Sequence, residues 1–166
     1  MNPKIVIAGG IGVVVLVIGA AWGLPRSPAA PAAVKAENSG KLGATEAAYD
    51  FGSVSMAKGV VTKKFMVVNN DDKTATVTKL FTSCMCTKAK LSVGGQNWGP
   101  FSMPGHGGSI PKIAAEVPAG ETAELEVTFD PAAHGPAGVG QIERTITVEQ
   151  NGQQPLTFGF RAMVTP

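Results

Sequence analysis

The sequence predicts an all-β domain, an antiparallel β-sandwich of about seven strands, carried behind an N-terminal transmembrane helix. Two observations predict the sandwich: apolar and polar residues alternate in several short segments, and turn-forming residues separate those segments. No segment of this region has a helical period of useful length. The helix is predicted by an uncharged apolar run near the N-terminus.

The apolar run extends from Ile5 to Leu24 and contains no charged residue. About 20 apolar residues are enough to cross the hydrocarbon core of a bilayer. The alternative is a cleaved signal peptide, with Lys4 in its n-region and a cleavage site near Ala21. A short head, residues 1–4, before a long folded tail favours a cytoplasmic N-terminus. We therefore expect a lipid-spanning segment and a periplasmic or cell-surface domain, or a secreted domain if the leader is cleaved.

Residues 25–44 are rich in proline, alanine and small polar residues and have no apolar period. They are predicted to be a semi-extended linker. The folded domain is predicted to occupy residues 45–166.

The first half of the domain contains three predicted strands. The segment "AAYDFGSV" is a short strand ended by Gly52, and "VVTKKFMVVNN" alternates, with Phe65 and Val67 on one face and Lys64 on the other. The segment "NNDDK" is a turn, because Asn and Asp bond their own backbone. The β-branched segment "TATVTKLFTS" follows as the next strand.

The second half has clearer alternation. In "ETAELEVTFD", every second residue from Ala123 to Phe129 is apolar, and "IERTITVEQ" repeats the pattern with Ile142, Ile146 and Val148. Asn151-Gly152 predicts a hairpin. The closing segment "PLTFGFRAMV" is expected to direct these residues inward: Leu156, Phe158, Phe160, Ala162 and Val164.

Several of these segments, in this order, resemble the bacterial domain of unknown function 1573. They are "YDFGSV", the strand containing "FMVVNN", "SCMCT", "PAGETAELEVTFDP", "RTITVEQN" and "PLTFGFRAMV". That family is similar to immunoglobulin-like sandwich domains of the major-sperm-protein and cilia-associated type. The resemblance, over about residues 49–164, implies an immunoglobulin-like fold and export, but no catalytic activity. Two features depart from the family pattern: Met85 replaces a usual glycine, and residues 92–117 form an inserted loop.

Cys84 and Cys86 are the only cysteines, and they are expected near the end of a strand. Residues i and i+2 of a strand share a face, with Cα atoms about 6.6 Å apart. That separation is at the upper limit for a disulfide, so a bridge would require a bend. Three alternatives remain open: a local disulfide or buried structural thiols, a redox pair, and a soft-metal site.

Thiolate and thioether ligands select Cu(I) or Zn(II), and two cysteines are too few for a closed zinc site, which takes four ligands, so the soft-metal alternative would use copper. Its expected ligands are Cys84 and Cys86, with Met85, Met103 and His106 as auxiliary groups. The other histidine, His134, lies in a Pro/Gly-rich segment and is predicted to be a solvated loop residue.

Trp98 and Phe101 in the insertion predict either a partner-contact surface or a plug over the core. Charged residues make up 16% of the chain and the net charge is +2, with no basic stripe, which argues against nucleic-acid binding. No catalytic motif is visible, so no enzyme activity is predicted. The leading prediction is a membrane-anchored, extracytoplasmic interaction or structural module that contacts an envelope protein. The alternative is a copper-handling or thiol-redox protein.

Overall fold

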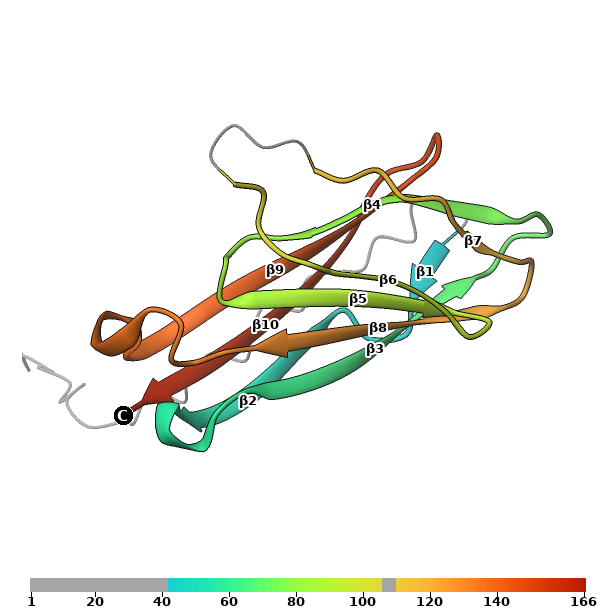
Figure 1. Cartoon of the computed structure of the whole chain (residues 1–166). Coiled ribbons are helices and arrows are strands. Elements are labelled where there is room, and N and C mark those ends of the chain that lie inside the picture. The colour runs from blue at the N-terminus through green and yellow to red at the C-terminus, as the bar shows by residue number, and fades with distance from the viewer. Residues whose placement is uncertain (1–41, 106–109) are drawn as a thin grey trace, which may run out of the picture.

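The computed structural model describes residues 42–105 and 110–166, and their fold is an all-β sandwich (Figure 1). Ten strands form two five-stranded sheets. The first sheet has the order β1-β3-β8-β5-β6, and the second has the order β2-β10-β9-β4-β7. The strands and two short 3-10 helices are β1 Leu42–Ala44, β2 Ala48–Ser55, η1 Met56–Lys58, β3 Val61–Asn69, β4 Ala75–Thr82, β5 Thr87–Val93, β6 Gln96–Phe101, β7 Ala115–Val117, β8 Thr122–Phe129, η2 Gly135–Gly138, β9 Gly140–Gln150 and β10 Leu156–Thr165.

The expected sandwich is confirmed, but the expected number of about seven strands is wrong. Four of the ten strands are not among the six segments interpreted as strands from the sequence: β1, β5, β6 and β7. β1 pairs with β3, so the folded domain already includes Leu42, within the range expected to be linker. β6 and β7 lie inside the segment expected to be an inserted loop.

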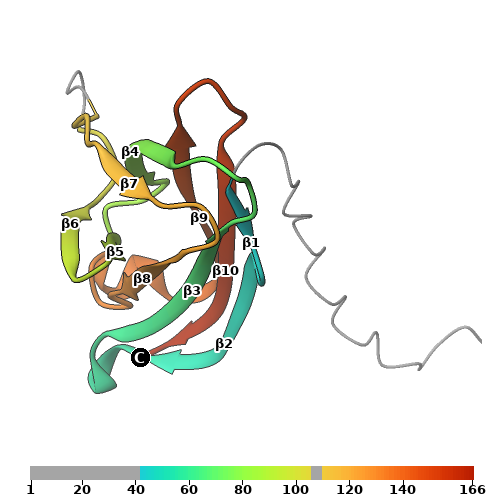
Figure 2. The ribbon, with the colours of Figure 1, turned by 90° about the vertical axis from the view of Figure 1, so that its right-hand side faces the viewer.

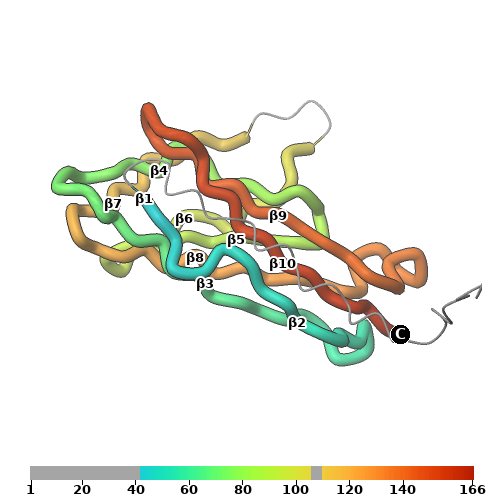
Figure 3. The backbone as a smooth tube through the Cα atoms, turned by 180° about the vertical axis from the view of Figure 1, so that it is seen from behind, coloured from blue at the N-terminus to red at the C-terminus, as the bar shows by residue number. Residues whose placement is uncertain are grey.

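The sandwich is also not wholly antiparallel, because β2 pairs with β10 in parallel. Figure 3 shows these two strands side by side. β2 does not end at Gly52 as expected. Gly52 has a φ of +65°, and the register with β10 shifts at this point, so the glycine forms a bulge and the strand continues to Ser55.

The core lies between the two sheets, which Figure 2 shows as two layers. Alternating residues of β8 and β10 fill it as expected, and the Phe65 and Phe158 rings meet across the layers at 5.2 Å between centroids. Burial of such apolar surface is the main favourable term in folding. Within the described residues, no helix has the length and apolar character needed to cross a bilayer. The predicted membrane segment, Ile5–Leu24, and His106 lie outside the described residues.

Candidate functional site

Two connections between the sheets meet at one end of the sandwich. The turn 83–86 leads from β4 in the second sheet to β5 in the first, and residues 130–139 lead from β8 in the first sheet to β9 in the second. Thr87 pairs with Phe129, and Thr82 pairs with Ile146. The residues just beyond these pairs must therefore lie together, and Figure 1 shows both connections at the end nearest the C-terminus.

The cysteines lie in this turn, directly after the end of β4, so the Cα separation of an extended strand does not apply to them. The Thr87 N–H donates to the Cys84 carbonyl oxygen at 3.1 Å, closing the turn. The buried Thr82 hydroxyl lies 2.9 Å from the Cys84 carbonyl oxygen and 3.1 Å from that of Thr87. The turn also places the Cys86 N–H 3.4 Å from the Cys84 sulfur. Both cysteines are free thiols, and the fold holds them side by side.

His134 completes a group of three ligand atoms with the two thiols. Its Nε2 lies 3.2 Å from the Cys84 Sγ. The sulfur atoms of Cys84 and Cys86 and a ring nitrogen of His134 all lie within 4.8 Å of one another. Cys84 is 9% exposed and Cys86 is 3% exposed, whereas His134 is exposed to solvent. The group is thus buried on the sulfur side and open on the imidazole side.

Arg144 of β9 lies beside this group. It has the same strand parity as Ile142, Ile146 and Val148, so it is on the core-facing side of β9 at the end of the sandwich. Its Nε donates to the Cys86 Sγ at 3.3 Å, and its Nη1 donates to the Glu143 carbonyl oxygen at 2.7 Å. In residues 42–105 and 110–166, no carboxylate forms an ion pair with Arg144.

These contacts make the two thiols unequal. Burial alone would raise the pKa of Cys84, but hydrogen bonds with Cys86 and His134 and the charge of Arg144 lower it to about 7. Burial and the hydrogen bond with Cys84 raise the pKa of Cys86. Cys84 is therefore the first of the two thiols to ionise, and a thiolate is the form that binds metals and attacks electrophiles.

The other expected ligands are placed differently. The Met85 side chain is 61% exposed, and that of Met103 is 40% exposed and lines a shallow pocket with Phe101 and Pro104. The sequence did not identify His134 or Arg144 as site residues. His134 is solvated, as expected, but it also contacts Cys84.

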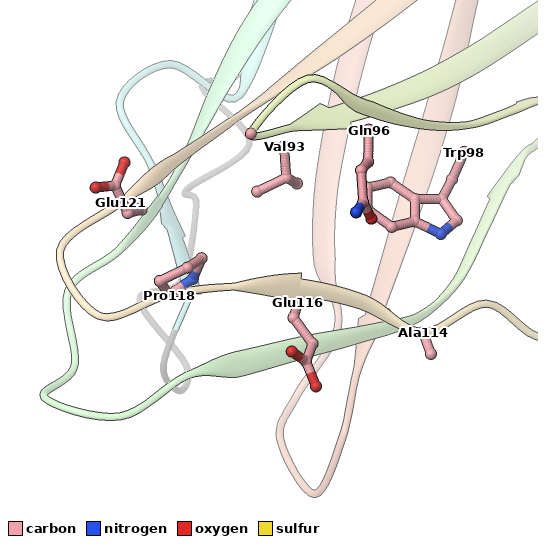
Figure 4. A pocket seen from close by; sticks show the side chains of 8 residues that line it. Val93, Gln96, Trp98, Ala114, Glu116, Pro118 and Glu121 are labelled. Carbon is pink, nitrogen blue, oxygen red and sulfur yellow. The ribbon is translucent and has the colours of Figure 1, made fainter.

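A second feature is a groove between the free edges of the two sheets. Trp98 and Phe101 pack partly against the core, as the plug alternative predicts. Trp98 also lines a groove of about 540 Å³. Figure 4 shows Val93, Gln96 and Trp98 on one side of it and Glu116 and Pro118 on the other.

Comparisons with known proteins bear on the fold only. No protein-family model matches the chain, and no curated protein sequence matches it. A solved structure of a Porphyromonas gingivalis protein of unknown function is similar, with 13% identity and a TM-score of 0.50. The match covers 70% of this chain and 44% of the other, so this chain spans less than half of that protein.

Two further structures resemble the chain more distantly. The PapD-like domain 7 of human CEP192 has a TM-score of 0.49 and 12% identity, and the match covers 86% of this chain and 97% of that one. The YadV chaperone has a TM-score of 0.49 and 5% identity, with 76% and 53% covered. These likenesses show the β-sandwich fold alone, and the particular chemistry of the chain rests on its own residues.

Proposed function

We propose that this protein is an extracytoplasmic β-sandwich that binds a thiophilic metal ion at Cys84, Cys86 and His134. One observation carries the proposal: two sulfur atoms and one imidazole nitrogen lie within 4.8 Å of one another. Thiolates and imidazole together suit copper and zinc ions. The fold brings these groups together from two separate connections, so the ligand set is formed in the folded domain before any ion binds.

The site's position outside the cytoplasm is part of the same proposal. Its support is the uncharged run Ile5–Leu24 and the resemblance of residues 49–164 to the domain of unknown function 1573. Exported chains rarely keep two adjacent free thiols in an oxidising compartment. A bound metal ion protects thiolates from oxidation, and this gives a physical reason for their retention.

Metal titration of the full-length chain, reduced and purified in detergent, tests the proposal. We expect one Cu(I) or Zn(II) ion per chain by native mass spectrometry. Cys84→Ser and Cys86→Ser should each abolish stoichiometric binding, and His134→Ala should weaken it at least about tenfold. The matched control is Asn70→Ala, which changes an exposed residue at the opposite end of the sandwich. Unchanged binding in the double variant Cys84→Ser/Cys86→Ser, or no binding by the wild-type chain, would overturn the proposal.

A second candidate function is a protein-interaction module that uses the groove between β6 and β7. The groove favours it because two sheet edges without a further strand flank an aromatic side chain, and an extended peptide can add to such an edge. A photo-crosslinking residue at Gln96 in cells should give a discrete adduct, and the same residue at Lys64 on β3 should not. Equal adducts at both positions would show that the groove has no special role.

A further inference from the structure

Arg144 is a charged residue on the side of β9 whose other residues are mostly apolar and face the core. Its side chain is half-buried, and a nearby negative charge offsets part of the cost of removing the guanidinium from water. No carboxylate supplies that charge in the described parts of the chain. The polar partners of Arg144 are the Cys86 sulfur at 3.3 Å and a backbone carbonyl oxygen. The groups that act on Arg144 electrostatically and can become negative are the Cys86 and Cys84 thiols.

The net charge of the two thiols, His134, Arg144 and the bound ion differs between Cu(I) and Zn(II). Two thiolates and a neutral imidazole carry a charge of −2, and Arg144 adds +1. A monovalent ion brings the whole group to zero, whereas a divalent ion leaves it at +1. Because Cys86 is 3% exposed and Cys84 is 9% exposed, a residual charge is only partly screened by solvent.

The number of protein ligands also favours Cu(I) over Zn(II). Among the described histidine, cysteine and acidic residues, only three groups come together here. Thiolates bind both Cu(I) and Zn(II), but structural zinc sites almost always have four protein ligands in a tetrahedron, so three ligands fall short of a closed zinc site. Met85, on the same turn, is 61% exposed.

We propose that Arg144 makes this centre selective for Cu(I) over Zn(II) by neutralising the negative charge of the Cu(I)-bound thiolates. The inference rests on the proposed metal-binding function. Arg144 is not a ligand; it acts through Cys86. Removal of its charge should weaken Cu(I) binding, since that complex is negative without it. The same change should leave Zn(II) binding nearly unchanged, because the Zn(II) complex is neutral without it.

The test compares affinities for the two ions in one set of variants. The full-length, reduced chain is titrated anaerobically with Cu(I) against bicinchoninate and with Zn(II) against a chromophoric chelator. Arg144→Gln should lower the Cu(I) affinity by about ten- to a hundredfold and change the Zn(II) affinity little. Arg144→Lys keeps the charge and should retain most of the Cu(I) affinity. Arg161→Gln is the matched control, because it removes one arginine charge from β10, where Arg161 contacts Asp50 and not the thiols.

The outcomes separate the two proposals. If the wild-type chain binds neither ion, the metal-binding function fails and the inference fails with it. If it binds both ions but Arg144→Gln weakens both equally, Arg144 has only a structural role and the selectivity inference alone is overturned. An unchanged Cu(I) affinity in Arg144→Gln overturns it as well. Circular dichroism and urea unfolding show whether the variants are folded. If Arg144→Gln does not fold, the comparison of Arg144→Lys with the wild-type chain still tests the inference.

Discussion

At the residue scale, Cys84 depends on His134 for its chemistry. The imidazole Nε2 is 3.2 Å from the sulfur, and this hydrogen bond is one of the contacts that lower the Cys84 pKa to about 7. A thiol in a buried turn would otherwise have a raised pKa, because low polarity disfavours the charged form. The His134 contact thus offsets part of the cost of burying the thiolate.

This relation predicts a specific pH dependence of thiol reactivity. In the metal-free, reduced chain, alkylation of Cys84 by iodoacetamide should rise through a midpoint near pH 7, because only the thiolate reacts. Below that pH the thiol is protonated and alkylation is slow. His134→Ala removes one of the interactions that lower the pKa, so the midpoint should move upward. Peptide mass spectrometry across pH measures this, and an unchanged midpoint in His134→Ala would contradict the account.

The sequence predicted only part of the site at this scale. Cys84 and Cys86 were identified because they are the only cysteines and are two residues apart. His134 is 50 residues from Cys84, and the pairings of β5 with β8 and of β4 with β9 bring the two together. Arg144 did leave a signal, since it interrupts the inward apolar positions of "IERTITVEQ". A charged residue at an inward position of a strand marks a site where polar partners are needed.

At the element scale, Asn69 joins β3 to β7 at the opposite end of the sandwich. It is fully buried, and its Nδ2 donates to the carbonyl oxygens of Lys73 and Val117 at 2.8 Å and of Pro118 at 3.1 Å. β3 belongs to the first sheet and β7 to the second, so one side chain connects the two layers. The side chain also shapes the predicted turn, because its Oδ1 accepts from the Asp71 N–H at 3.1 Å.

Asn69→Ala should therefore lower the free energy of unfolding by about 1–3 kcal/mol, the cost of leaving buried carbonyl groups unpaired. Urea unfolding of the reduced chain measures the change. Asn70→Ala is the matched control, because Asn70 is the next residue in the turn and is exposed. Metal affinity should stay the same in both variants, since the turn is far from Cys84. Equal stability of the two variants would show that the Asn69 hydrogen bonds contribute little.

Strands that bury alternate side chains were predictable, and the others were not. In β8, the apolar residues Ala123, Leu125, Val127 and Phe129 are all buried, so the pattern and the structure agree. β6 has the sequence "QNWGPF", which contains no alternation, and it is a strand because it pairs with β5. The parallel pairing of β2 with β10 is equally invisible in the sequence, because it joins segments about one domain length apart. The alternation of apolar and polar residues within a segment shows which side chains are buried. Which strand pairs with which depends on the fold of the whole chain.

At the scale of the whole molecule, the domain has two distinct ends. The described chain begins at Leu42, which pairs with Asn69 and whose N–H donates to Gln150 Oε1 at 3.2 Å. Gln150 ends β9, whereas Arg144 lies toward the other end of that strand, next to the cysteines. The chain therefore enters the sandwich at the end opposite the proposed metal centre. With a membrane anchor before Leu42, the centre would be on the side of the domain remote from its point of attachment.

The proposed export predicts that Cys84, the more exposed and more readily ionised thiol, can be labelled from outside the cell after a chelator has removed any bound metal. A membrane-impermeant maleimide should label the full-length chain in intact spheroplasts, and the only possible sites are Cys84 and Cys86. The double variant Val14→Asp/Val15→Asp places two charges in the apolar run, where each costs about 2.5–3.5 kcal/mol at the centre of a helix. It should therefore stay inside the cell, and its thiols should be labelled only after lysis.

The control is Ala32→Asp/Ala33→Asp, which adds the same charges to the linker and should leave labelling unchanged. Because an anchor and a cleaved leader both need the apolar run, the double variant tests export and not retention. The mass of the exported chain then separates the two: an intact N-terminus means an anchor, and a chain starting near residue 22 means cleavage. If wild-type thiols react only after lysis, the domain is inside the cell. In that case the proposal could no longer explain the two thiolates as protected by a metal ion from an oxidising compartment.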